Sequence, residues 1–341
     1  MQRCLELAIL GAGNVAPNPM VGAVLVCDDK IIGEGWHQQY GSDHAEVICV
    51  NSVAAVNKKQ VEKSILYVSL EPCVHFGKTP PCTDFIIKNK IPTVVIACRD
   101  SFFAVDGRGI EKLKHAGVEV ITGVLEKEAQ HLNKAFFLFQ QKKRPYIILK
   151  WAETANKKIA GLDFERVAIS NVCSNRLVHK WRSESAAIMV GTNTALHDNP
   201  SLTTRLFSGN SPVRIVIDKQ LKLTSNFHLL NNEVKTIFFN NIKDAVENKT
   251  VYIKINFAGK VLQQIMEHLA AMKIQTLLVE GGSILLQSFI DEGLWDEARV
   301  IQNQALILQE GIDAPQLKEC SIISKADIFT DSITYYQHTN S

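Results

Sequence analysis

The chain has 341 residues, of which 46% are hydrophobic and 21% charged, and this length predicts two domains rather than one core. Its 37 lysines and arginines nearly balance 35 acidic residues, and the net charge of +2 argues against a nucleic-acid-binding protein. No apolar run reaches the roughly 18 residues of a membrane span. The N-terminal segment lacks the long apolar stretch of a cleaved signal peptide, and eight scattered cysteines form no disulfide scaffold, so we expect a cytoplasmic protein.

The first half of the chain alternates between strand-like and helix-like patterns. The expected strands are 20–27, 31–35, 65–70, 93–98 and 118–121. The expected helices are 45–56, 82–89 and 109–116. The first two strands flank an Asp-Asp-Lys turn and read as a hairpin, and a hairpin followed by β-α units implies a mixed sheet covered by helices.

Three potential metal ligands fall at the boundaries of these elements. His44 precedes a helix, Cys73 follows a strand, and Cys82 begins the next helix. One imidazole and two thiols leave the fourth zinc position open to water, which is typical of catalytic zinc. Glu46 stands two residues after the histidine, as in zinc deaminases, and could move protons to and from that water. We therefore predict hydrolytic loss of ammonia from an amino-heterocycle. The alternative is a structural zinc, with His75 as the nearby rival ligand.

The second half begins after a polar, basic stretch that ends in proline, 140–145, so the predicted domains are 1–143 and 144–341. The expected strands are 146–150, 186–190, 213–218, 235–239, 251–255 and 276–279. The expected helices are 261–272 and 283–292. The strand at 276–279 enters its helix through Gly281 and Gly282. Such a turn can admit a phosphate to the helix N-terminus, although glycine also serves turns for backbone reasons alone.

Several strings of residues carry a family resemblance. They are Asn18–Gly22, His44–Glu46, Leu70–Cys73, Gly77–Cys82, Val178–Arg182 and Gly191–Arg205. Together they resemble the bifunctional bacterial riboflavin-biosynthesis proteins, in which a pyrimidine deaminase is fused to a reductase. The long loop between the two cysteines is that family's form and differs from the C-x-x-C of nucleic-acid deaminases. The resemblance implies an α/β chain with a cytidine-deaminase-like N-terminal domain and a dihydrofolate-reductase-like C-terminal domain.

The resemblance also implies cofactors and residue roles. Zinc would be held by His44, Cys73 and Cys82, with Glu46 as the proton shuttle. The phosphorylated pyrimidine substrate would be bound by Asn18, His37, Lys78, Arg182, Leu202, Arg205 and Glu280. NADPH, which reduces the ribosyl group to ribityl, would be bound by Glu153, Thr194, Asp198, Gly282 and Ser283. Paired arginines suit a phosphate, and an isolated acid at Glu280 suits sugar hydroxyls. Family members commonly form homo-oligomers.

The second half departs from the family pattern at three places. Asn156-Lys157 replaces Asp-Gly, which carries a conformational cost if φ at Lys157 is positive. Ala168–Ser170 replaces Trp-Ile-Thr, and Arg166 stands where serine is usual. A live deaminase with a degenerate, non-catalytic reductase-like half is therefore one alternative. A nucleic-acid editing deaminase is another, although the near-neutral charge and the long cysteine loop count against it.

Overall fold

A computed structural model describes residues 1–100, 105–162 and 167–339, so Arg166 lies outside the described residues. The contacts divide the chain into two compact units, Met1–Lys143 and Arg144–Ser341. Each unit builds its own sheet, of five strands in the first and ten in the second. Within the described ranges, no helix is long and apolar enough to cross a membrane.

The first unit is a mixed sheet with helices on both faces. Its strands are β1 (Gly22–Cys27), β2 (Lys30–Trp36), β3 (Ile65–Leu70), β4 (Thr93–Cys98) and β5 (Glu119–Thr122), in the order β2-β1-β3-β4-β5. Its helices are α1 (Gln2–Ile9), α2 (Ala45–Asn51), α3 (Cys82–Lys88), α4 (Arg108–His115), α5 (Glu126–Leu132) and α6 (Lys134–Lys142). The predicted hairpin is confirmed as the antiparallel pair β1–β2, and β3, β4 and β5 run parallel.

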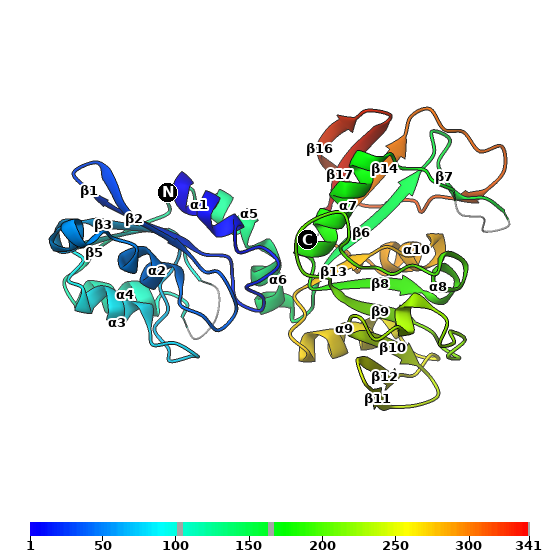
Figure 1. The fold of residues 1–341 in the computed structure, drawn as a ribbon, viewed down its shortest axis with the longest axis horizontal. Coiled ribbons are helices and arrows are strands. Elements are labelled where there is room, and N and C mark those ends of the chain that lie inside the picture. The colour runs from blue at the N-terminus through cyan, green and yellow to red at the C-terminus, as the bar shows by residue number, and fades with distance from the viewer. Residues whose placement is uncertain (101–104, 163–166, 340–341) are drawn as a thin grey trace. The chain divides into compact units, whose positions relative to one another are not determined.

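Two layers of helices enclose this sheet. Figure 1 shows α2, α3 and α4 on one side of it and α1 and α5 on the other. The first layer packs on fully buried strand residues such as Leu25, Leu66 and Ile96. The predicted helix 45–56 is too long, because α2 ends at Asn51 and a 3₁₀ helix, Ala55–Lys63, follows. Helices α1, α5 and α6 were not predicted from the sequence.

The second unit is built on a larger sheet in which seven neighbouring strands run parallel. Its strands are β6 (Tyr146–Glu153), β8 (Ala187–Gly191), β9 (Val213–Ile217), β10 (Thr236–Asn240), β11 (Ala245–Glu247), β12 (Thr250–Lys254), β13 (Thr276–Val279), β14 (Glu297–Asn303), β16 (Cys320–Ile328) and β17 (Asp331–His338). Their order is β11-β12-β10-β9-β8-β13-β6-β14-β17-β16. Two short strands, β7 (Lys158–Ala160) and β15 (Ile312–Asp313), pair separately. The strands from β14 onward were not predicted.

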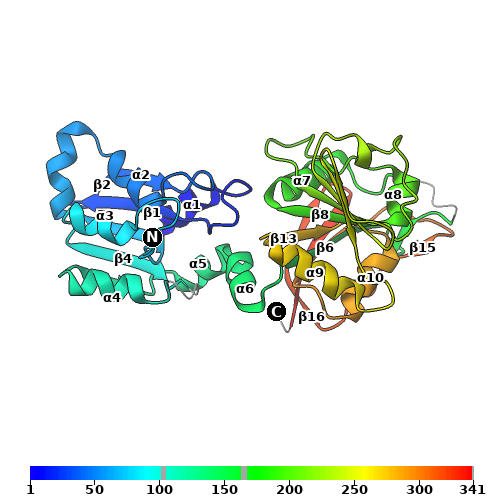
Figure 2. The same ribbon diagram turned by 90° about the horizontal axis from the view of Figure 1, so that it is seen from below.

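The helices of the second unit are α7 (Val172–Glu184), α8 (Thr192–Asp198), α9 (Val261–Ala271) and α10 (Ser283–Asp291). Figure 2 shows α9 and α10 together on one face of the sheet, where they cover its main apolar core. The carboxyl ends of β6, β8 and β13 lie at one edge of the sheet because these strands are parallel. Ligands of open α/β sheets bind at this edge, and α8 and α10 both begin there.

The turn between β6 and β7 carries Lys157 at φ 61°, so the conformational cost anticipated from the missing glycine is present. A residue with a side chain is about 1–2 kcal/mol less stable than glycine in this left-handed conformation. Replacement by glycine removes this strain, but it also raises the entropy of the unfolded chain, which offsets part of the stabilisation. We expect Lys157→Gly to raise the free energy of unfolding by about 0.5–1 kcal/mol. Urea unfolding measures this free energy. Lys222→Gly is the control, because φ is not positive at Lys222 and this variant should therefore lose stability. Equal losses in both variants would contradict the expectation.

Candidate functional sites

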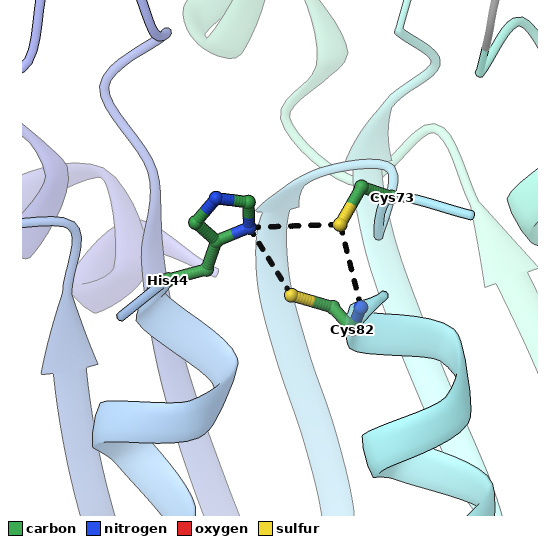
Figure 3. A group of neighbouring side chains, drawn as sticks. All are labelled: His44, Cys73 and Cys82. Atoms are coloured by element: carbon green, nitrogen blue, oxygen red, sulfur yellow. Dashed lines mark hydrogen bonds between the residues drawn. The ribbon is translucent and has the colours of Figure 1, made fainter. Parts of the chain in front are cut away.

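Three side chains from separate elements of the first unit converge on one point (Figure 3). The Nδ1 atom of His44 lies 3.3 Å from Cys82 Sγ and 3.6 Å from Cys73 Sγ. His44 is the N-cap of α2, Cys73 follows β3, and Cys82 is the first residue of α3. The structure therefore places the three predicted ligands at the predicted element boundaries.

This cluster fits a zinc ion. Its three donor atoms all lie within 4.8 Å of one another. Tetrahedral zinc with bonds of about 2.0–2.3 Å holds its ligand atoms roughly 3.6 Å apart, which agrees with the two distances from His44. One nitrogen and two sulfurs complete three of four positions, as catalytic zinc requires.

The α3 N-terminus prepares Cys73 to act as a ligand. The backbone N–H of Cys82 donates to Cys73 Sγ at 3.3 Å, and the Thr83 hydroxyl donates to the Cys73 carbonyl at 3.1 Å. Hydrogen bonds from the Cys82 thiol and the His44 ring lower the pKa of Cys73, outweighing the opposite effect of burial. The thiolate, which is the form that binds metal, is thus favoured at this sulfur.

Glu46 lies in the first turn of α2, next to the cluster. Its side chain is buried, with 3% of the residue exposed, and it interacts with the Cys82 thiol. Burial raises the pKa of this carboxyl group above its ordinary value. A carboxyl group with a raised pKa can both accept and return a proton near neutral pH.

His37 and Asn18 form a polar pair beside the cluster. His37 Nδ1 lies 3.0 Å from the Asp43 carbonyl, which can only accept, so Nδ1 carries the proton. His37 Nε2 therefore accepts from Asn18 Nδ2 at 3.0 Å. Burial lowers the pKa of His37 and favours this neutral form. The His37 and His44 rings meet edge to face, with centroids 5.2 Å apart. The exposed Lys78 instead lies over the Tyr40 ring, 4.0 Å from its centroid.

The second unit holds a buried network of charges at the carboxyl ends of its strands. Arg182 on α7 donates to both oxygens of Glu280 through Nε and Nη2, at 2.9 and 2.8 Å. Lys150 Nζ on β6 lies 3.8 Å from Glu280 Oε2. Burial alone would raise the pKa of Glu280, but the charges of Arg182 and Lys150 outweigh it and hold that pKa at about 2.

This network corrects one expectation. Glu280 is not an isolated acid, because Arg182 holds it through two hydrogen bonds. Arg182 and Arg205, which were expected to bind a phosphate together, have different contacts. The Arg182 guanidinium group is hydrogen-bonded to Glu280. Arg205 is exposed, and its backbone N–H donates to His179 Nδ1 at 2.8 Å. Sequence reasoning also missed Lys150, although a lysine within an apolar strand was the available signal.

The remaining predicted residues are distributed along the same sheet edge. Gly282 N donates to Thr194 Oγ1 at 2.9 Å, which brings the starts of α8 and α10 together. Ser283 Oγ donates to the Asp313 carbonyl, and Asp198 is exposed at the end of α8. Leu202 is buried with φ 53°. The buried Glu153 accepts hydrogen bonds from the side chains of Trp151 and Gln302.

Two family models match the chain. The cytidine and deoxycytidylate deaminase zinc-binding region matches residues 1–98, and the RibD C-terminal domain matches residues 145–307. Among curated relatives, the Riboflavin biosynthesis protein RibD of Aquifex aeolicus is 39% identical, over 93% of this chain and 89% of its own length. The protein of the same name from Escherichia coli is 33% identical, over 93% of this chain and 94% of its own length.

Solved structures agree over almost the whole chain. A Thermotoga maritima structure described as a diaminohydroxyphosphoribosylaminopyrimidine deaminase/5-amino-6-(5-phosphoribosylamino)uracil reductase superimposes with a TM-score of 0.91 at 35% identity. The overlap covers 99% of this chain and 97% of that one. Acinetobacter baumannii RibD gives a TM-score of 0.89 at 28% identity, covering 98% and 97%. These matches confirm the fold classes expected for both halves.

Proposed function

Because the chain belongs to the RibD family of riboflavin-biosynthesis proteins, we propose that it catalyses both reactions in the name of its Thermotoga maritima relative. The observation that carries this proposal is the His44, Cys73 and Cys82 cluster with the buried Glu46 beside it. Residues 1–143 would deaminate the phosphorylated diaminopyrimidine, and residues 144–341 would reduce the ribosyl group of the product. Self-association and a cytoplasmic location stay predictions from the sequence.

The first unit would act by hydrolysis. Zinc held by His44, Cys73 and Cys82 would act as a Lewis acid that activates water at neutral pH. The Glu46 carboxylate accepts a proton from the attacking water and delivers it to the departing amino nitrogen, first as base and then as acid. With its Nδ2 donating to His37, Asn18 keeps its carbonyl oxygen as an acceptor for an N–H group of the pyrimidine.

The second unit would reduce a ribosyl carbon, for which NADPH supplies the hydride. Lys150, Arg182 and Glu280 together bring two positive charges and one negative charge to the site. The surplus positive charge suits the substrate phosphate, and Glu280 orients both cations. Of the two cations Lys150 is the possible proton donor, because burial lowers its pKa and arginine stays protonated.

The start of α10 suits the dinucleotide. A Cβ atom on Gly281 would lie 2.8 Å from Leu285 Cδ2, so a side chain there would require the Leu285 side chain to shift. The first turn of any helix has N–H groups without intrahelical acceptors, and phosphate is a natural acceptor for them. Thr194 fixes this turn through its bond from Gly282. The backbone therefore fits a pyrophosphate at this position.

A cavity of about 610 Å³ lies further along the same sheet edge, at the ends of β9, β10 and β12. Lys219 and Lys254 line it, and Lys219 follows the strand next to β8. We assign this cavity to the adenosine 2′-phosphate of NADPH.

A charged hydrogen bond is worth about 1.5–3 kcal/mol, so Lys219→Gln should raise the KM for NADPH by about tenfold or more and leave the KM for NADH unchanged. Lys222→Gln is the control, and equal changes for both cofactors would refute the assignment.

One experiment tests both activities. The purified zinc-loaded chain is given the diaminopyrimidine phosphoriboside with NADPH, and ammonia release and NADPH oxidation are followed in the same sample. We expect ammonia first, and then NADPH oxidation in equal amount. Ammonia release without NADPH oxidation would favour the single-activity alternative. Absence of both would refute the proposed function.

A further inference from the structure

Glu71 is a buried acid that stands two residues before the ligand Cys73. Only 4% of the residue is exposed. Its side chain accepts four backbone hydrogen bonds. Oε1 accepts from Gly109 at 2.8 Å and Ile110 at 3.2 Å, and Oε2 accepts from Gly107 at 3.0 Å and Asp100 at 3.3 Å. A carboxylate offers only acceptors, so it matches a cradle made entirely of N–H donors.

The cradle joins two segments that are distant in sequence from Glu71. Gly107, Gly109 and Ile110 belong to the cap and first turn of α4, where a negative charge is favoured by the helix dipole. The backbone N–H of Glu71 donates in turn to the Cys98 carbonyl at the end of β4, at 3.0 Å. Glu71 is thus fixed through its backbone to β4 and through its side chain to α4.

Helix α4 packs directly against the backbone of the Pro72–Cys73 segment. A Cβ atom on Gly109 would lie 2.3 Å from the Pro72 carbonyl oxygen and 3.0 Å from Glu71 Oε1. Only glycine permits this approach, because a backbone atom blocks any side chain. Beyond Cys73 the loop is exposed at Phe76, Gly77 and Lys78. The position of Cys73 therefore depends on its anchor at Glu71 and on the bonds from Cys82 and Thr83.

We propose that Glu71 is a positioning residue for the metal centre. Its carboxylate locks Pro72–Cys73 against the start of α4, and this places Cys73 Sγ at the distance from His44 that a shared ion needs. The inference rests on the proposed zinc-dependent function. It adds a residue that touches neither substrate nor metal and acts through Cys73.

The test is the rate of zinc release to a chromogenic chelator, measured on the full-length zinc-loaded chain well below its unfolding temperature. In Glu71→Gln the side-chain NH₂ group would face backbone N–H groups, and two donors cannot form a hydrogen bond. We expect this variant to release zinc about 10–100-fold faster, since loss of a supporting hydrogen bond around a metal site usually has an effect of this size. Glu71→Asp, which keeps the charge on a shorter side chain, should restore part of the difference. Gly109→Ala leaves Glu71 intact but separates α4 from Pro72, and it should release zinc faster too.

Two controls separate positioning from general instability. Val94→Ala removes buried volume from β4 in the same unit without touching the cradle, and should leave zinc release unchanged. Glu62→Gln removes an exposed acid paired with Lys90 and should also have no effect. Wild-type release rates in both Glu71→Gln and Gly109→Ala would overturn this inference alone. A wild-type chain that binds no zinc would overturn the proposed function as well.

Discussion

Replacing Glu46 with glutamine is expected to lower the deaminase kcat by about 10³- to 10⁴-fold, the upper part of the range for a positioned acid-base group. The amide cannot accept the proton of the attacking water, and among the described residues Glu46 is the buried acid with a raised pKa beside the cluster. NADPH oxidation by the same variant, given the deaminated substrate, should stay at the wild-type rate because the second unit is unchanged.

Zinc content distinguishes loss of chemistry from loss of metal in this variant. Glu46 is not one of the three clustered ligands, so Glu46→Gln should keep one zinc per chain. Glu119→Gln, an exposed acid of the same unit, is the matched control and should retain full activity. Ammonia release at the wild-type rate from Glu46→Gln would remove Glu46 from the mechanism.

Replacing Glu280 with glutamine is expected to lower the free energy of unfolding of the second unit by about 3–5 kcal/mol, as for other buried pairs that lose one partner. The change leaves Arg182 and Lys150 without their counter-charge, at 13% and 14% side-chain exposure. Reductase activity should be lost with it. Tryptophan fluorescence reports on this unit, because three of the four tryptophans, Trp151, Trp181 and Trp295, belong to it.

The same carboxylate predicts a pH dependence. The pKa of Glu280 is about 2 in the folded chain against an ordinary 4.5. A lowered folded-state pKa means that its stabilisation is complete above 4.5 and is lost as the pH falls toward 2. The free energy of unfolding, measured with urea, should fall more steeply over this interval in the wild type than in Glu280→Gln. Parallel pH profiles would contradict the prediction, and Glu184→Gln, at a more exposed ion pair with Lys180, is the control.

The elements that the sequence predicted best are those whose burial pattern is local. The strands β3, β4 and β13 agree closely with their apolar runs, because both faces of a central parallel strand are buried. The missed elements have weaker patterns. Strand β16 is exposed along most of its length and is identified only by its pairing with β17. Helix α7 shows a mixed polar pattern in which His179 and Arg182 face the site rather than solvent.

The donor set of the metal centre can be identified from the sequence alone, because the types of His44, Cys73 and Cys82 and their places at the ends of strands and helices are local properties. Which charged groups come into contact depends on the three-dimensional fold. Glu280 lies 98 residues from Arg182, and Glu71 lies 38 residues from Gly109. Such pairings depend on the order of strands in the sheet and on close helix packing, and no local pattern encodes them. The same holds for His37, whose proton position follows from one carbonyl and one amide that only the fold brings to its ring.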